Sequence, residues 1–63
     1  MRKVKKSEMK VVPAPNGKQV MVRLDGEWVG VSRVGQDECI EDLDHVGIGE
    51  TVEAGTEKVQ VIE

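Results

Sequence analysis

The densest group of side chains that could do chemistry is acidic and lies in the second half of the chain. It comprises Asp37, Glu38, Cys39, Glu41, Asp42, Asp44, His45, Glu50 and Glu53. Asp42, Asp44, Gly47 and Glu53 share the spacing of a calcium-binding loop, but Val46 stands where that loop needs another oxygen ligand. The neighbouring residues do not predict the helix pair on which such a loop depends, so we expect no dedicated calcium site.

Cys39 and His45 are the only soft metal ligands in the chain. A structural zinc site needs more ligands than these. Nucleophilic catalysis by Cys39 would need His45 as a base and a further group to orient it, and acidic neighbours disfavour a thiolate. A chain of 63 residues also leaves little room for a catalytic pocket beside its core. We therefore expect a buried Cys39, a loop His45, no metal or cofactor, and no enzymatic activity.

A hairpin between residues 18 and 33 offers a different kind of site, a binding surface. Residues 18–24 and 27–33 alternate apolar and polar side chains on either side of Asp25-Gly26, the pair of residues typical of a tight hairpin turn. The turn sets Arg23 opposite Trp28, and the predicted register adds Leu24 with Glu27, Val22 with Val29, Met21 with Gly30 and Val20 with Val31. One face then carries only aliphatic residues, which are Val20, Val22, Leu24, Val29 and Val31.

We expect the opposite side of this hairpin to contact a protein partner through Met21, Arg23, Trp28 and Arg33. Arg23 can form a cation–π pair with Trp28, the only aromatic residue of the chain. Two interpretations of Trp28 remain open, since a lone tryptophan can close the core of a small barrel or serve as an exposed anchor. The acidic segment is predicted to add an electrostatic patch formed by Asp37, Glu38, Glu41, Asp42 and Asp44.

The charges divide between the two halves of the chain and suggest an alternative function. Residues 1–33 carry a balance of +5 and residues 34–63 a balance of −8, within a formal net charge of −3. The alternative is a small β domain that binds nucleic acid phosphates through Arg2, Lys3, Lys5, Lys6, Lys10 and Lys18. A single aromatic residue is few for base stacking, and the acidic half repels phosphate, so protein binding is the first hypothesis.

The remaining sequence predicts short strands rather than helices. Twelve valines and three isoleucines favour a pleated surface, whereas only two leucines and two alanines are present. We expect a flexible basic tail over residues 1–9 and one domain over residues 10–63. Further strands are expected at 10–12, 38–41, 46–53 and 57–63, with Pro13 at a sheet edge and either one helical turn or a loop at 41–45. The predicted fold is all-β, a five- or six-stranded small barrel of SH3-like or OB-like type.

Two stretches also resemble parts of the biotinyl and lipoyl carrier family. They are Val12-Pro13-Ala14-Pro15 followed by Gly17, and residues 49–55 together with Val61-Ile62-Glu63. The resemblance implies that these stretches form adjacent strands of a flattened barrel-sandwich. Asp25-Gly26 occupies the hairpin tip where that family carries a lysine, so we expect at most a carrier-like domain without a modification site.

The expected setting is the cytoplasm, with a protein partner and no membrane contact. One cysteine excludes an intrachain disulfide, and neither a membrane-spanning run nor a signal-type apolar stretch stands out. Homo-oligomerisation is a further option, because exposed valine-rich strand edges pair readily.

Overall fold

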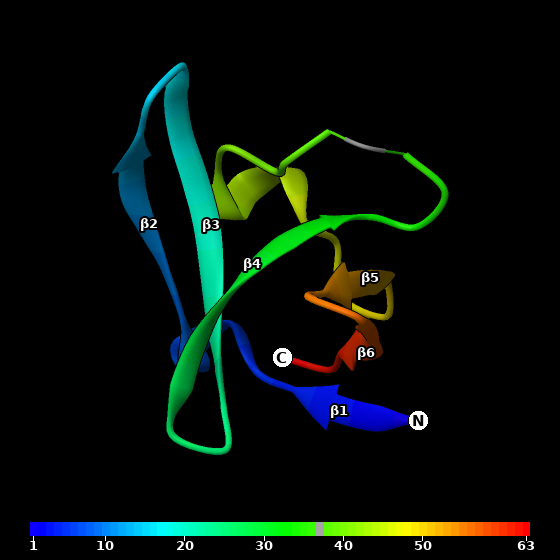
Figure 1. Ribbon diagram of the computed structural model, residues 1–63. Coiled ribbons are helices and arrows are strands. Elements are labelled where there is room, and N and C mark those ends of the chain that lie inside the picture. The colour runs from blue at the N-terminus through cyan, green and yellow to red at the C-terminus, as the bar shows by residue number, and fades with distance from the viewer. Residues whose placement is uncertain (37) are drawn as a thin grey trace.

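A computed structural model describes residues 1–36 and 38–63 as an all-β arrangement (Figure 1). Its elements are the strands β1 (Arg2–Val4), β2 (Met9–Ala14), β3 (Gly17–Leu24), β4 (Glu27–Arg33), β5 (Thr51–Ala54) and β6 (Glu57–Val61), with single 3₁₀ turns η1 (Lys6–Glu8) and η2 (Leu43–His45). The sheet order is β1-β6-β5-β4-β3-β2, so the sheet stays open between β1 and β2 rather than closing into a barrel. No helix in the described part of the chain has the length and apolarity to cross a membrane.

The hairpin formed by β3 and β4 has the register that the sequence predicts at its turn. Arg23 lies opposite Trp28, and Val22 lies opposite Val29. Asp25 and Gly26 both have positive φ angles, of 52° and 84°. Such a pair of angles defines the turn whose twist matches that of antiparallel strands, which explains why Asp-Gly is favoured here.

The hairpin departs from the prediction at its far end, where Val20 and Val31 do not meet. The Ile40 amide nitrogen donates to the Val31 carbonyl at 3.1 Å, and the Ile40 carbonyl accepts from the Val20 amide nitrogen at 2.7 Å. Ile40 is thus inserted between the two strands and lets β4 leave β3. The end of β4 pairs with β5 instead, with Val31 opposite Ala54.

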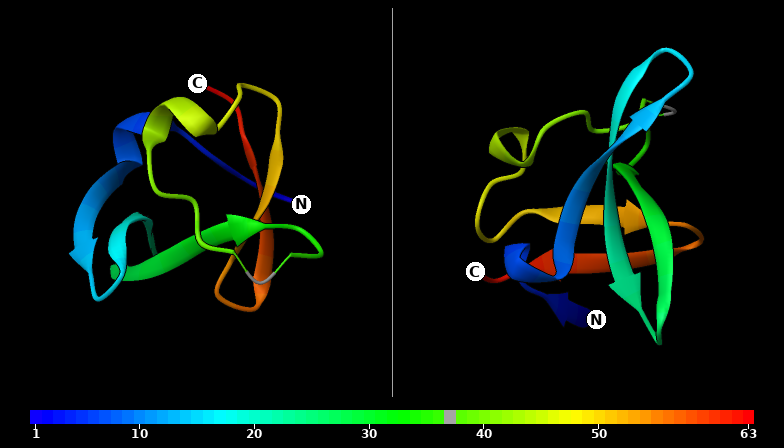
Figure 2. Two further views of the ribbon diagram at one scale, coloured as in Figure 1. Left: turned by 90° about the horizontal axis from the view of Figure 1, so that it is seen from above. Right: turned by 90° about the vertical axis from the view of Figure 1, so that its left-hand side faces the viewer.

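The core lies between the two parts of the folded sheet. Figure 2 shows β5 and β6 running across β2, β3 and the start of β4. The buried apolar residues are Val4, Met9, Val20, Val22, Leu24, Val31, Ile40, Val46, Val52, Ala54, Val59 and Val61. Four of the five predicted core residues of the hairpin are among them, and Val29 is half-buried. A set dominated by valine fits because β-branched side chains lose little rotamer freedom in strands.

The expected flexible tail over residues 1–9 is wrong. Residues 2–4 form β1, which pairs with β6 in parallel, and the segment closes over the core through Val4, which is 2% exposed. The Lys6 amide nitrogen donates to the Glu63 carbonyl at 2.6 Å and the Ile62 amide nitrogen donates to the Val4 carbonyl at 2.9 Å. The buried side chains of Val4 and Met9, together with these backbone hydrogen bonds, anchor this otherwise basic segment.

β2 is an edge strand, as Pro13 predicts. It pairs with β3 on one side only, through a hairpin whose turn is Pro15-Asn16. β2 and β5 are separated by β3 and β4, so the stretches that resemble the carrier family are not adjacent strands here. The strand expected at 46–53 begins only at Thr51, as β5, because Gly49 has a φ angle of 90° and the Gly47 amide nitrogen donates to the Glu50 side chain, which makes a turn.

Candidate functional site

Trp28 lies at the surface of the β2-β3-β4 part of the sheet and is 38% exposed. The sequence left its role open between core and surface, and the structure places it outside the buried core. Two cations contact its ring. The Lys10 ammonium nitrogen is 4.0 Å from the ring centre, and the guanidinium carbon of Arg23 is 6.0 Å from it. Arg23 was predicted from the register, whereas Lys10 comes from β2 and was assigned only to the alternative, nucleic acid site.

The rest of this surface is formed by alternate residues of the same strands. Lys10 lies opposite Met21, and Met21 lies opposite Gly30. A Cβ atom on Gly30 would stand 2.1 Å from the side-chain nitrogen of Gln19, so glycine leaves room for that amide to lie over the strand. We call the surface of Lys10, Gln19, Met21, Arg23, Trp28 and Gly30 the tryptophan face.

Arg33 does not belong to the tryptophan face, although the sequence analysis grouped it with Trp28. Alternation along β4 turns Arg33 to the same side as Val31. Its guanidinium donates to the Glu50 carboxylate and, at 2.5 Å, to the His45 carbonyl. Arg33 therefore fastens η2 and the following turn to the end of β4, and this role explains why it is only partly exposed.

The predicted acidic patch lies near the start of β3, where Glu41 approaches Gly17. Asp42 accepts a hydrogen bond from the Asp44 amide nitrogen at 3.1 Å and thereby caps η2, while Asp44 itself is exposed. Glu38 and Glu41 are exposed and line a cavity. Asp37 lies outside the described residues.

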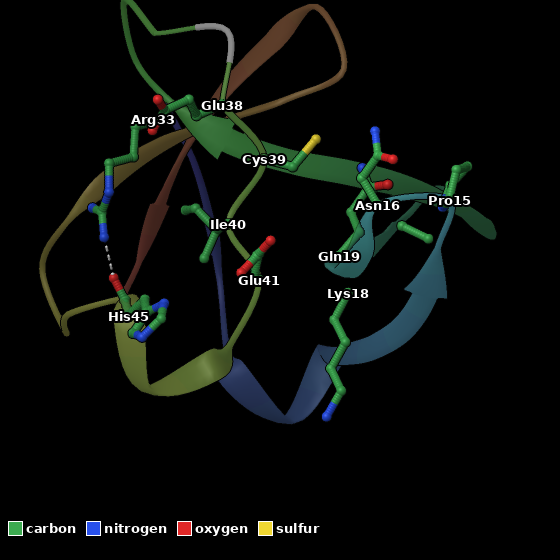
Figure 3. A pocket seen from close by; sticks show the side chains of 11 residues that line it. Pro15, Asn16, Lys18, Gln19, Arg33, Glu38, Cys39, Ile40, Glu41 and His45 are labelled. Carbon is green, nitrogen blue, oxygen red and sulfur yellow. Dashed lines mark hydrogen bonds between the residues drawn. The ribbon is translucent and has the colours of Figure 1, made fainter.

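That cavity has a volume of about 610 Å³ and opens between the β2–β3 turn and the segment before η2 (Figure 3). Pro15, Asn16 and Lys18 form one wall, and Ile40 lies between the two sides. Cys39 is exposed here, contrary to the prediction that it is buried, because Ile40 takes the inward position of this short segment. Among residues 1–36 and 38–63, no group of three or more His, Cys, Asp or Glu side chains is placed to hold a metal ion.

The basic residues of the alternative nucleic acid site are spread over the molecule. Arg2 pairs with Asp25 at 3.2 Å and with Glu57 at 3.1 Å, and the hydrogen bond to Asp25 raises the pKa of Arg2. Lys5 pairs with Glu63 at 3.6 Å. Lys18 lies at the cavity, whereas Lys3 and Lys6 belong to β1 and η1. The structure thus brings together Lys10 and Arg23 around Trp28, but it does not gather the six predicted cations on one surface.

Comparison of the chain with protein families, with characterised proteins and with solved structures finds no match. The geometry of the site and the chemistry of its residues are therefore the basis for the functional assignment that follows.

Proposed function

We propose that this domain is a non-catalytic accessory or regulatory module that binds another protein through the tryptophan face. The observation that carries this proposal is an exposed tryptophan whose ring is contacted by two cations. Trp, Met and Arg are the residue types enriched at the energetic centres of protein interfaces, and this surface presents one of each together.

The anchor is also ordered before any partner binds. Trp28, Met21 and Arg23 lie on hydrogen-bonded strands, and the contacts of Lys10 and Arg23 restrict the indole ring. Binding then costs little side-chain entropy, which is one of the main opposing terms in association. A rigid aromatic anchor is thus available in a domain too small for a deep pocket beside its core.

The charge of the tryptophan face selects the chemistry of the partner. In the described part of the chain neither Lys10 nor Arg23 forms an ion pair, whereas Arg2, Lys5 and Arg33 do. The complementary partner surface is acidic around an apolar side chain that packs on Trp28. The exposed acids Glu38, Glu41, Asp42 and Asp44 form a proposed second patch near the start of β3, suited to a basic region of a partner.

The alternative function, nucleic acid binding, draws less support from the same contacts. Arg2 and Lys5, two of the cations assigned to phosphate contacts, already have carboxylate partners. The proposed fold type remains a small barrel, SH3-like or OB-like, opened between β1 and β2. A strongly bent β4 shared by both parts of the sheet supports this type, and a carrier-like role has no comparable support.

The test is a pull-down from cell lysate, with and without nuclease, using the wild-type chain, Trp28→Ala and Ile48→Ala. Ile48 is 61% exposed and lies outside the tryptophan face, so it is a matched control for loss of surface apolar area. The proposal predicts proteins that wild type and Ile48→Ala retain after nuclease treatment and that Trp28→Ala loses. Retention that disappears with nuclease supports the nucleic acid alternative, and equal retention by all variants contradicts the tryptophan face.

A further inference from the structure

The place where β3 and β4 separate leaves part of a strand edge unpaired. β3 pairs with β4 only over residues 21–24, and beyond this stretch Ile40 bridges Val20 and Val31. Lys18 and Gln19 therefore have β2 on one side and the cavity on the other.

The backbone groups of Lys18 point into this opening. The Val20 amide nitrogen donates to Ile40, on the side away from β2, and residues two apart in a strand turn their N–H and C=O groups the same way. Pro13 lies opposite Lys18 on β2 and has no N–H group, which fits a non-hydrogen-bonded pair. In such a pair the backbone N–H and C=O groups of Lys18 point away from β2. Within the described residues, neither backbone group of Lys18 makes a further hydrogen bond.

The same cavity is negatively charged around that edge. Glu38 and Glu41 line it without an ion pair in the described part of the chain, and Arg33 is occupied by Glu50 and the His45 carbonyl. Figure 3 shows the Glu41 carboxylate within the opening and the Lys18 side chain directed away from it. Glu41 also lies next to the strand edge, since its oxygen would be 3.2 Å from a Cβ atom on Gly17.

We propose that this cavity receives an extended basic segment of a partner protein. The segment adds one strand residue to β3 by exchanging hydrogen bonds with the backbone N–H and C=O of Lys18, and it sets a Lys or Arg side chain against Glu38 and Glu41. The cavity volume of about 610 Å³ accommodates a short peptide. The strand edge at the border of the cavity offers the main-chain groups with which such a peptide would pair. The site shares only Gln19 with the tryptophan face and does not use Trp28 or the cations around it.

The test uses the ¹⁵N-labelled full chain and the acetylated, amidated peptide Thr-Lys-Val-Lys-Thr, followed by ¹H–¹⁵N spectra. With so few main-chain bonds, we expect a dissociation constant of about 0.1 to 1 mM. The peptide should shift the amide signals of Lys18 and Glu41 and slow hydrogen exchange at Lys18. Replacing both carboxylates, Glu38→Gln and Glu41→Gln, should weaken binding about fivefold.

Three controls separate strand pairing at this cavity from other contacts. The same peptide with N-methylated amides at its three central residues should not bind, because those residues can no longer donate main-chain hydrogen bonds to β3. The peptide Thr-Glu-Val-Glu-Thr should bind at least fivefold more weakly, and Trp28→Ala should bind the basic peptide like wild type. An unshifted Lys18 amide at about 5 mM peptide, or equal binding of the N-methylated peptide, would overturn the proposal.

Discussion

The ammonium nitrogen of Lys10 lies 4.0 Å from the centre of the Trp28 ring, although eighteen positions separate the two residues along the chain. The contact joins β2 to β4 across β3, above Met21 and Gly30. The contact links the edge strand β2 to Trp28, the proposed anchor. Its strength can therefore be measured by substituting either of the two residues.

Lys10→Ala should lower the free energy of unfolding by about 0.5 to 1 kcal/mol, the usual strength of an exposed cation–π contact. Trp28 is the only aromatic residue, so its fluorescence reports both the unfolding transition in urea and the surroundings of the ring. Lys3→Ala is the matched control, because Lys3 is exposed and has no cation–π contact in the described residues. Equal losses for the two variants would show that the ammonium does not stabilise the indole.

Arg33→Ala should lower the free energy of unfolding by more than Lys10→Ala does, by about 1 to 2 kcal/mol. The substitution removes the guanidinium that donates to the partly buried Glu50 carboxylate and to the His45 carbonyl. A double-mutant cycle with Glu50→Gln, followed by circular dichroism in urea, measures the pairing directly. Arg23→Ala is the control, with an expected loss of about 0.5 kcal/mol from an exposed surface position. A coupling energy near zero between Arg33 and Glu50 would contradict the structural role given to Arg33.

Ile40→Ala should destabilise the domain by about 2 to 4 kcal/mol, because Ile40 is 3% exposed and separates β3 from β4. A domain this small has little stability to lose, so Ile40→Val, with an expected cost of about 1 kcal/mol, keeps the measurement possible. Ile48→Ala removes the same side-chain atoms from a position that is 61% exposed and should change stability by less than about 0.5 kcal/mol. Similar unfolding midpoints for Ile40→Val and wild type would argue against the insertion of Ile40 between the strands.

Pro13→Thr should promote self-association of the domain. Pro13 places no N–H on the open side of β2, and at the start of the strand the Met9 amide nitrogen is occupied by the Lys6 carbonyl. Threonine restores a donor at an edge strand, and such edges template pairing between chains. Sedimentation analysis over a range of concentrations should show a larger dimer fraction for Pro13→Thr than for Pro15→Thr in the adjacent turn. No difference between these variants would mean that Pro13 does not protect the edge.

The sequence predicted the parts of the fold that depend on local chemistry. Asp25-Gly26 determines a turn, and the alternation around it places Arg23 opposite Trp28 and turns Val22 and Val31 inward. Pro13 indicated an edge strand because it cannot donate to a ladder. These features depend only on residues that are close together in the sequence.

Several features that the sequence missed depend on contacts between distant segments. β1 was taken for a tail because its pairing with β6 is parallel and requires the opposite end of the chain. The position of Arg33 depends on β4 leaving β3 at Ile40, and the Lys10 contact depends on the register of β2. For Arg33 the sequence did contain one signal. Alternation along β4 places the side chains of Arg33 and Trp28 on opposite faces of the sheet.

The most direct test of the proposed contact surface is photo-crosslinking from a benzophenone amino acid placed at position 21, beside Trp28, and at position 48 for comparison. The chain carrying it at position 21 should form a discrete covalent product with a partner protein, insensitive to nuclease and suppressed by excess wild-type chain. The chain carrying it at position 48 should not form that product. Crosslinking from position 48 alone, or from neither position, would contradict binding through the tryptophan face.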